Sequence, residues 1–171
     1  MMNTILFKTF ILIITGLSLN LCFSPLAMAA ALPADTSAKT PPVHRVVVYY
    51  LHNTFRCSSC NSIGNLTQAA VLGGEVENLE TGEESRVAPA FQHFVDQEKL
   101  SFSFVNVDEP ENHHFLQNFQ TSSKFPVIAE IKDGEILRFK VLDRVWRLLE
   151  GENSRFISYI QQNVHDFFKN L

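Results

Sequence analysis

Two cysteines lie close together in a context that suits thiol chemistry. Cys57 and Cys60 enclose a Ser-Ser dipeptide, directly after an apolar run and at the start of a segment with helical periodicity. Residues at i and i+3 on a first helical turn share a face, so the two sulfurs can form a disulfide. At Cys57, unpaired backbone N–H groups, the helix dipole and the neighbouring Arg56 would stabilise the attacking thiolate. We therefore expect Cys57 to be the nucleophile and Cys60 to resolve the mixed disulfide.

Two other uses of the cysteine pair stay open. A purely structural bridge is one, although closing only four residues removes little chain entropy. A metal site is the other, but two thiolates cannot fill a tetrahedral zinc site without His52, His113 or His114. Adjacent residues on a helix point about 100° apart, so His113 and His114 rarely reach one ion. The favoured interpretation of the sequence therefore has no metal site, and metal binding by the two thiolates stays the alternative.

Residues 1–29 have the features of a secretion signal. Lys8 is the only charged residue among them, and an apolar run extends from Phe10 to Phe23. The segment 27–29 reads Ala-Met-Ala, a small-x-small site of the kind that signal peptidases cut. The apolar run is shorter than the about 20 residues that span a bilayer, although an uncleaved membrane anchor is the alternative. We therefore expect an exported protein, periplasmic or extracellular.

The composition of the rest of the chain excludes several classes of protein. Residues 30–42 are rich in Ala, Pro and Thr and are expected to form a flexible linker. The hydrophobic content of 46% is too high for a disordered chain, and the net charge of −4 argues against a nucleic-acid partner. Once a signal is removed, Cys57 and Cys60 are the only cysteines left, and outside the cytosol their disulfide can persist.

The periodicity of residues 43–171 predicts one α/β domain. Strand patterns occur at 46–51, 101–107, 125–131 and 136–141, and helical patterns begin at 57, 89, 108 and 144 before a last helix around 156–168. An acidic segment at 75–88 separates the first two helices and is expected to be a solvated surface insertion. A strand–helix–strand unit implies parallel pairing, and a hairpin adds an antiparallel pair. We expect a mixed central sheet with helices on both faces.

This order resembles the thioredoxin superfamily over nearly all of residues 43–170. The resemblance rests on a strand, a C-x-x-C helix, and Pro126 before a hairpin. Residues 50–57, 105–112 and 142–146 more closely resemble a bacterial family, the ArsF-type "nitrophenyl compound nitroreductase subunit". That family name implies reductive electron transfer, with protein thiols and disulfides or a membrane thiol-electron carrier as partners. The sequence has no Gly-rich flavin or nicotinamide loop, so no cofactor is expected.

The resemblance also implies roles for individual residues. In the superfamily the proline is cis and faces the cysteines, which implies that role for Pro126 after Phe125. Thioredoxins keep a buried acidic proton acceptor near the end of the first strand, a position that Leu51 holds here. His52 and Glu130 are then the candidates for proton handling.

The expected function is a thiol–disulfide oxidoreductase or electron-transfer subunit. The dipeptide between the cysteines is Ser-Ser, and it lacks the histidine that accompanies extreme thiolate stabilisation in a strong periplasmic oxidant. Two alternatives remain: a metal or metalloid carrier that uses the same two thiolates, and a redox-inactive interaction module with a thioredoxin-like fold.

Overall fold

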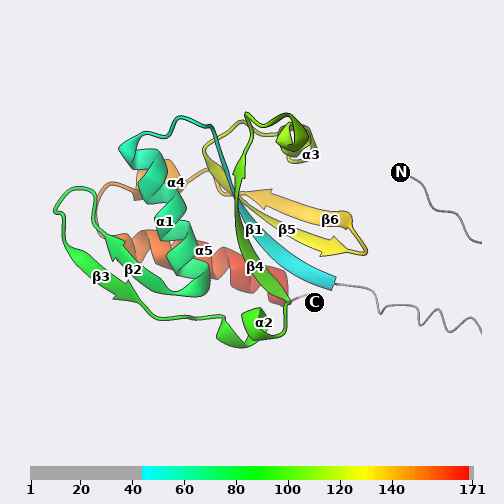
Figure 1. Cartoon of the computed structure of the whole chain (residues 1–171). Coiled ribbons are helices and arrows are strands. Elements are labelled where there is room, and N and C mark those ends of the chain that lie inside the picture. The colour runs from blue at the N-terminus through cyan, green and yellow to red at the C-terminus, as the bar shows by residue number, and fades with distance from the viewer. Residues whose placement is uncertain (1–43, 170–171) are drawn as a thin grey trace, which may run out of the picture. The chain divides into compact units, whose positions relative to one another are not determined.

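A computed structural model describes residues 44–169 (Figure 1). This part of the chain is a mixed α/β domain with a central sheet of four strands. The predicted signal at 1–29 and the predicted linker at 30–42 lie outside the described residues. Within 44–169, none of the helices has both the length and the apolar character needed to cross a membrane.

All four predicted strands of the central sheet are present. They are β1 (His44–His52), β4 (Leu100–Asn106), β5 (Phe125–Lys132) and β6 (Glu135–Val141). The long helices are α1 (Ser58–Leu72) and α5 (Asn153–Phe168). Shorter elements are α2 (Gln92–Asp96), the 3-10 helix η1 (Pro110–Asn112), α3 (His114–Asn118) and α4 (Val145–Leu148). A separate hairpin consists of β2 (Gly74–Glu77) and β3 (Glu84–Val87).

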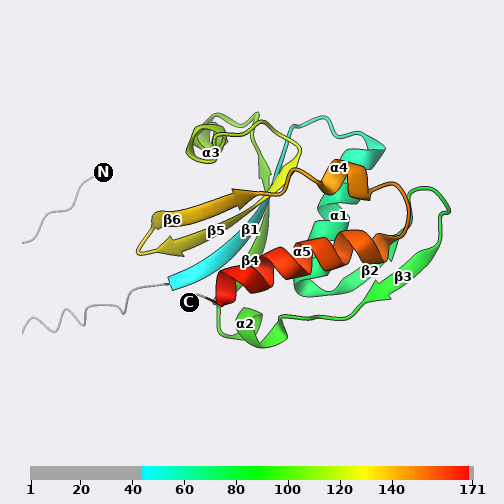
Figure 2. The ribbon, with the colours of Figure 1, turned by 180° about the vertical axis from the view of Figure 1, so that it is seen from behind.

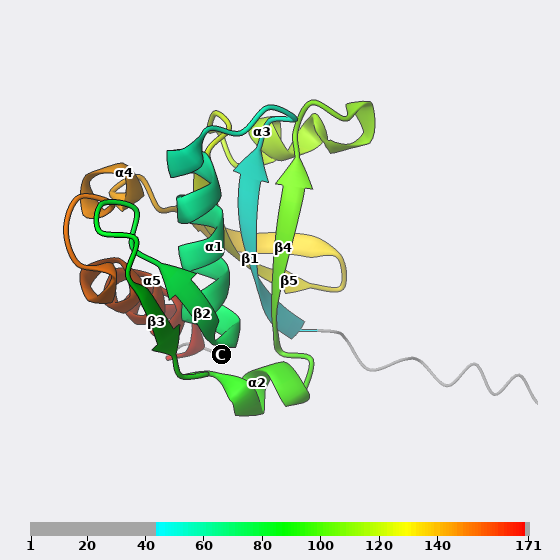
Figure 3. The ribbon, with the colours of Figure 1, turned by 60° about the vertical axis from the view of Figure 1, so that its left-hand side comes forward.

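The central sheet has the order β4-β1-β5-β6. β1 runs parallel to β4 and antiparallel to β5, which confirms the predicted mixed sheet. Figure 3 shows β1 and β4 side by side with their arrowheads at the same end, where the chain turns from β1 towards α1. Asp133 and Gly134 join β5 to β6 with φ angles of 54° and 86°, as a tight two-residue hairpin turn requires. This topology places the cysteine pair beyond the carboxyl end of β1.

Alternate residues of β1 enter two different cores. Val46, Val48 and Tyr50 are buried with α1 and α5, whereas Val47 and Leu51 are buried with Phe119 from the other side of the sheet. Figure 2 shows α5 and α1 together, and α3 at the end where β1 leads into α1. The expectation of helices on both faces is confirmed, although the short helix α3 provides the helical cover of the second face.

The acidic segment 75–88 differs from the expected solvated loop. Most of it is the β2–β3 hairpin, in which Glu75 pairs with Arg86 and Val76 is only 5% exposed. Val76 belongs to the core beneath α1, so burial of this side chain anchors the hairpin. Each strand has only four residues, which is too short for the period-two pattern to stand out in the sequence.

The helix expected from residue 108 onward is also different, because it is divided into η1 and α3. Its first residues make side-chain bonds that compete with helix formation. The Asn112 amide donates to the Asn106 carbonyl over 2.9 Å and to the Glu109 carboxylate over 3.0 Å. Such local bonds favour turns over a regular helix.

Gly64 lets α1 approach the sheet closely, and this gives a test of the packing. A Cβ atom at this position would lie 2.7 Å from Phe104 Cε1 and 2.8 Å from Tyr50 Cδ1. Alanine is intrinsically more favourable than glycine within a helix by about 1 kcal/mol, but overpacking a tight core costs about 1–3 kcal/mol. We therefore expect Gly64→Ala to lower the free energy of unfolding in urea. The control is Gln68→Ala, an exposed position on the same helix, and a stabilised Gly64→Ala variant would contradict this packing.

Candidate functional site

The two cysteines form a disulfide at the start of α1. Cys57 is the N-cap residue of the helix, and its Cα atom lies 5.0 Å from that of Cys60. The backbone N–H of Cys60 donates to Cys57 Sγ over 3.2 Å. Cys57 is exposed, whereas Cys60 is 1% exposed. A partner sulfur can therefore reach Cys57 but not Cys60, and an N–H group already points at the sulfur that would carry negative charge.

A network of side chains holds the loop that leads into Cys57. Asp108 accepts from the Asn53 amide over 2.7 Å and from the backbone N–H of Thr54 over 2.8 Å. Ser123 donates to Asn53 Oδ1 over 2.5 Å, and Asn106 donates to Thr54 Oγ1 over 3.0 Å. The Thr54 N–H, followed by the Asn53 amide, lowers the pKa of Asp108 from its ordinary value. The sequence suggested no such network, because Asn53 and Asp108 are 55 residues apart.

Tyr50 lies beneath the disulfide and was not among the predicted site residues. Its hydroxyl donates to the Cys60 carbonyl over 2.6 Å in a buried contact. Burial raises the pKa of Tyr50 to about 12, although the charge of Arg56 acts in the opposite direction. The phenol therefore stays protonated near neutral pH and acts as a donor rather than a base. Leu51, expected at the buried acceptor position, instead faces the opposite core.

His52 and Arg56 flank the aromatic ring of Phe104. The Arg56 guanidinium lies 5.7 Å from the centre of the Phe104 ring, and the His52 ring centre lies 6.0 Å from it. His52 Nδ1 is 2.9 Å from the carbonyl oxygen of Asn53. His52 and Arg56, both predicted from the sequence to support the cysteine pair, thus lie on either side of the loop before Cys57 and near the Phe104 ring.

Phe125 and Pro126 lie beside β1 at the level of Leu51 and Tyr50. In the antiparallel register Pro126 pairs with Tyr50, whose hydroxyl contacts Cys60. Pro126 is buried as the second residue of β5. No cis peptide bond occurs in residues 44–169, so the cis Phe125–Pro126 bond implied by the resemblance is not found. The chain enters β5 instead through Lys124, which adopts a φ of 73° and donates its N–H to the Leu51 carbonyl.

Glu130 does not lie near the cysteines. It pairs with Val46 in the sheet register, four residues before Tyr50 along β1. Its carboxylate binds His44 Nε2 over 2.7 Å and also accepts from Arg138 Nε. Because both carboxylate oxygens are engaged at this end of the sheet, the hypothesis that Glu130 handles protons for the disulfide is wrong.

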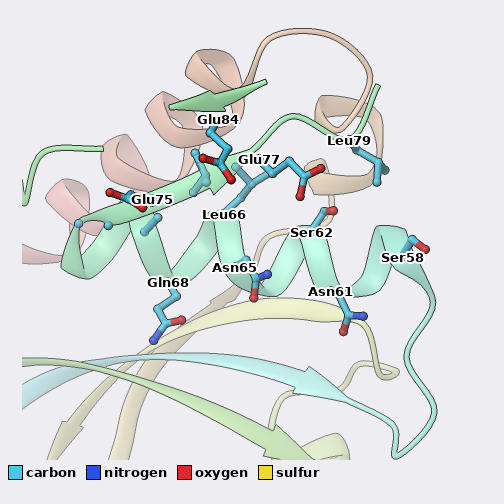
Figure 4. Close-up of a pocket in the computed structure, with 14 residues that line it drawn as sticks. Ser58, Asn61, Ser62, Asn65, Leu66, Gln68, Glu75, Glu77, Leu79 and Glu84 are labelled. Atoms are coloured by element: carbon cyan, nitrogen blue, oxygen red, sulfur yellow. The ribbon is translucent and has the colours of Figure 1, made fainter. Parts of the chain in front are cut away.

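A polar cleft of about 690 Å³ runs between α1 and the β2–β3 hairpin (Figure 4). One end is at Ser58, next to Cys57. Figure 4 shows Glu75, Glu77 and Glu84 on the hairpin, and amide side chains such as Asn61 projecting from α1. No lysine or arginine lines this cleft among the residues that the structure describes. The surface on the α1 side of the disulfide is therefore rich in polar and acidic side chains, with Leu79 as an exposed apolar residue among them.

The histidines considered as metal ligands do not converge. His113 and His114 are exposed, and His114 Nδ1 lies 2.7 Å from the carbonyl oxygen of Glu111. In the described range 44–169, histidine, cysteine and acidic side chains form no group of three or more that could hold a metal ion.

Comparisons with protein-family models, with curated proteins and with solved structures find no match to this chain. The function proposed below therefore rests on the disulfide and the residues around it.

Proposed function

We propose that this protein is an exported thiol–disulfide oxidoreductase or electron-transfer subunit with a thioredoxin-like fold. The observation that carries the proposal is the asymmetry of the cysteine pair. Cys57 is exposed at the N-cap of α1 with its sulfur accepting an N–H group, and Cys60 is buried one turn further on. Exchange chemistry needs one accessible sulfur with a stabilised thiolate and one shielded sulfur to complete the cycle.

The proposed reaction transfers two electrons through a mixed disulfide. A partner thiolate attacks Cys57 Sγ, the Cys57–Cys60 bond breaks, and Cys60 leaves as a thiolate that takes up a proton. The partner's second thiolate then attacks the partner sulfur that is bonded to Cys57. This step forms the partner's disulfide and releases Cys57 as a thiolate. The partner dithiol is oxidised to a disulfide while this protein is reduced, and the reverse sequence reduces a partner disulfide.

The assignment to a thioredoxin-like fold and to the ArsF-type family is part of this proposal. The mixed sheet, the C-x-x-C helix directly after β1 and Pro126 at the start of β5 are compatible with that fold. Two of the segments that resemble the family, 50–57 and 105–112, are in contact through Asn53 and Asp108. A membrane thiol-electron carrier and protein thiols or disulfides are the proposed partners, and no cofactor is invoked.

A redox titration of the purified protein tests the proposal. The N-terminus of α1 and the Cys60 N–H stabilise a Cys57 thiolate, whereas Ser58-Ser59 adds no histidine. We therefore expect a two-electron transition between about −270 and −150 mV in glutathione buffers, measured by thiol trapping. A value near about −120 mV would identify a disulfide donor instead.

Metal analysis after anaerobic purification completes this test. Stoichiometric metal or metalloid in a protein that shows no reversible redox transition would favour the thiolate carrier. A protein with neither property would be an interaction module.

A further inference from the structure

Phe55 is the most exposed large hydrophobic side chain in residues 44–169, with 85% of its surface accessible. It lies two residues before Cys57, and Phe104 on β4, which the Arg56 guanidinium approaches to 5.7 Å, is 36% exposed. Single exposed hydrophobic residues are common on protein surfaces, so exposure alone indicates little. The position of Phe55 and the way in which its backbone is held are more informative.

The loop around Phe55 is fixed on both sides. On one side the N–H of Thr54 donates to Asp108, and Thr54 Oγ1 accepts from Asn106. On the other side Cys57 is the N-cap of α1 and is bonded to Cys60. Only Phe55 and Arg56 lie between these two points, so the backbone that carries the phenyl ring has little freedom to move. The ring is 85% exposed on this anchored backbone, two residues before the disulfide-bonded Cys57.

Any partner that reacts with Cys57 must come close to Phe55. A disulfide holds the Cα atoms of its two cysteines about 4.4–6.8 Å apart, so the partner chain lies next to Cys57 during exchange. Phe55 is two residues from Cys57, within about 7 Å along an extended backbone. On the opposite side the partner meets Ser58 and the acidic cleft. Leu79, which is 43% exposed, also lines this cleft, but Phe55 is the more exposed apolar side chain and the one next to Cys57 in the sequence.

We infer that Phe55 selects polypeptide thiols in which the cysteine is flanked by an apolar side chain. This inference rests on the proposed exchange function and names the substrate class. Burying the phenyl ring against such a side chain would stabilise the mixed disulfide and the encounter before it. A small thiol such as glutathione has no large apolar side chain and would gain nothing from Phe55.

The test uses two synthetic peptides, Gly-Phe-Cys-Gly and Gly-Ser-Cys-Gly, whose thiol pKa values are measured first. Rate constants for reduction of the Cys57–Cys60 disulfide are measured at equal thiolate concentration. We expect the Phe peptide to react about tenfold faster with the wild-type protein. Phe55→Ser should abolish this preference while leaving the rates for the Ser peptide and for glutathione unchanged. The matched control is Leu137→Ser, since Leu137 is 53% exposed on β6, and this variant should keep the preference.

Any result other than a preference for the Phe peptide that Phe55→Ser abolishes overturns the inference. A wild-type protein without preference, or a Phe55→Ser variant that keeps it, would show that Phe55 does not contact the partner. An equal loss for both peptides and glutathione would show that Phe55 acts on Cys57 itself. If no thiol reduces the disulfide, the proposed function fails and the inference with it, whereas reduction at equal rates by both peptides refutes the inference alone.

Discussion

Replacement of Cys57 by serine is expected to abolish thiol–disulfide exchange, whereas Cys60→Ser should trap mixed disulfides with partner proteins. Cys57 is the exposed sulfur that a partner can reach, so its loss removes the first step. Cys60 is buried and acts second, so its loss leaves a Cys57-linked intermediate with no resolving thiol. Non-reducing electrophoresis and mass spectrometry of protein captured from cells would identify the adducts.

Replacement of a serine between the two cysteines, which leaves both sulfurs in place, provides the control. Ser59→Ala changes the dipeptide between the cysteines but should allow complete turnover. Equal trapping by the two cysteine variants, or none by Cys60→Ser, would contradict the assigned roles. Residual exchange in Cys57→Ser would show that Cys60 becomes accessible, contrary to its burial.

The cysteine pair was predictable because its signals are local. The apolar run of β1, the C-x-x-C spacing and the helical pattern after Cys57 all lie within 30 residues of sequence. Strand positions were likewise recognisable, because continuous or alternating apolar residues identify buried strands. Both kinds of signal depend on neighbouring residues and need no knowledge of tertiary contacts.

The rest of the site depends on contacts between distant segments. The role of Asp108 arises from bonds to Asn53 and Thr54, and no periodic pattern encodes a contact across 55 residues. Tyr50 could have been found from the alternation of β1, which places it on the α1 face and Leu51 on the other. The resemblance places Leu51 at the acceptor position, but the alternation of β1 directs its side chain to the core on the other side of the sheet.

Glu130 was assigned to the wrong end of the sheet for a similar reason. Glu130 was a candidate for proton handling because Leu51 holds the position of the acidic acceptor, but position along β5 decides which groups Glu130 meets. The antiparallel register carries Glu130 away from Tyr50 and towards His44. Its partners come from β1 and β6, and Arg138 also donates to the Phe167 carbonyl at the end of α5 over 2.8 Å. Glu130, His44 and Arg138 therefore join the sheet to the last helix, and their role is structural.

Glu130→Ala is accordingly expected to lower the free energy of unfolding by about 2–3 kcal/mol. Breaking a fully buried ion pair costs about 3–5 kcal/mol, but Arg138 and His44 have side chains that are 38% and 32% exposed, so water compensates part of the loss. Urea unfolding at pH 7 would measure the change. The control is Asp166→Ala, which removes the exposed pair with Lys169 and should leave stability unchanged within error. An equally stable Glu130→Ala variant would contradict the structural role.

The effect of Glu130 should also depend on pH in a defined direction. Burial by itself raises the pKa of Glu130, but hydrogen bonds and charge from Arg138 and His44 outweigh it and hold the pKa below the ordinary value of 4.5. A carboxyl whose folded pKa is lowered contributes stability above its unfolded pKa, and this contribution is lost as the pH falls through the folded value. The difference in unfolding free energy between wild type and Glu130→Gln should therefore be full at pH 7 and shrink below about pH 4.5. A difference that stays constant down to pH 3 would show that the charge of Glu130 contributes nothing to the fold.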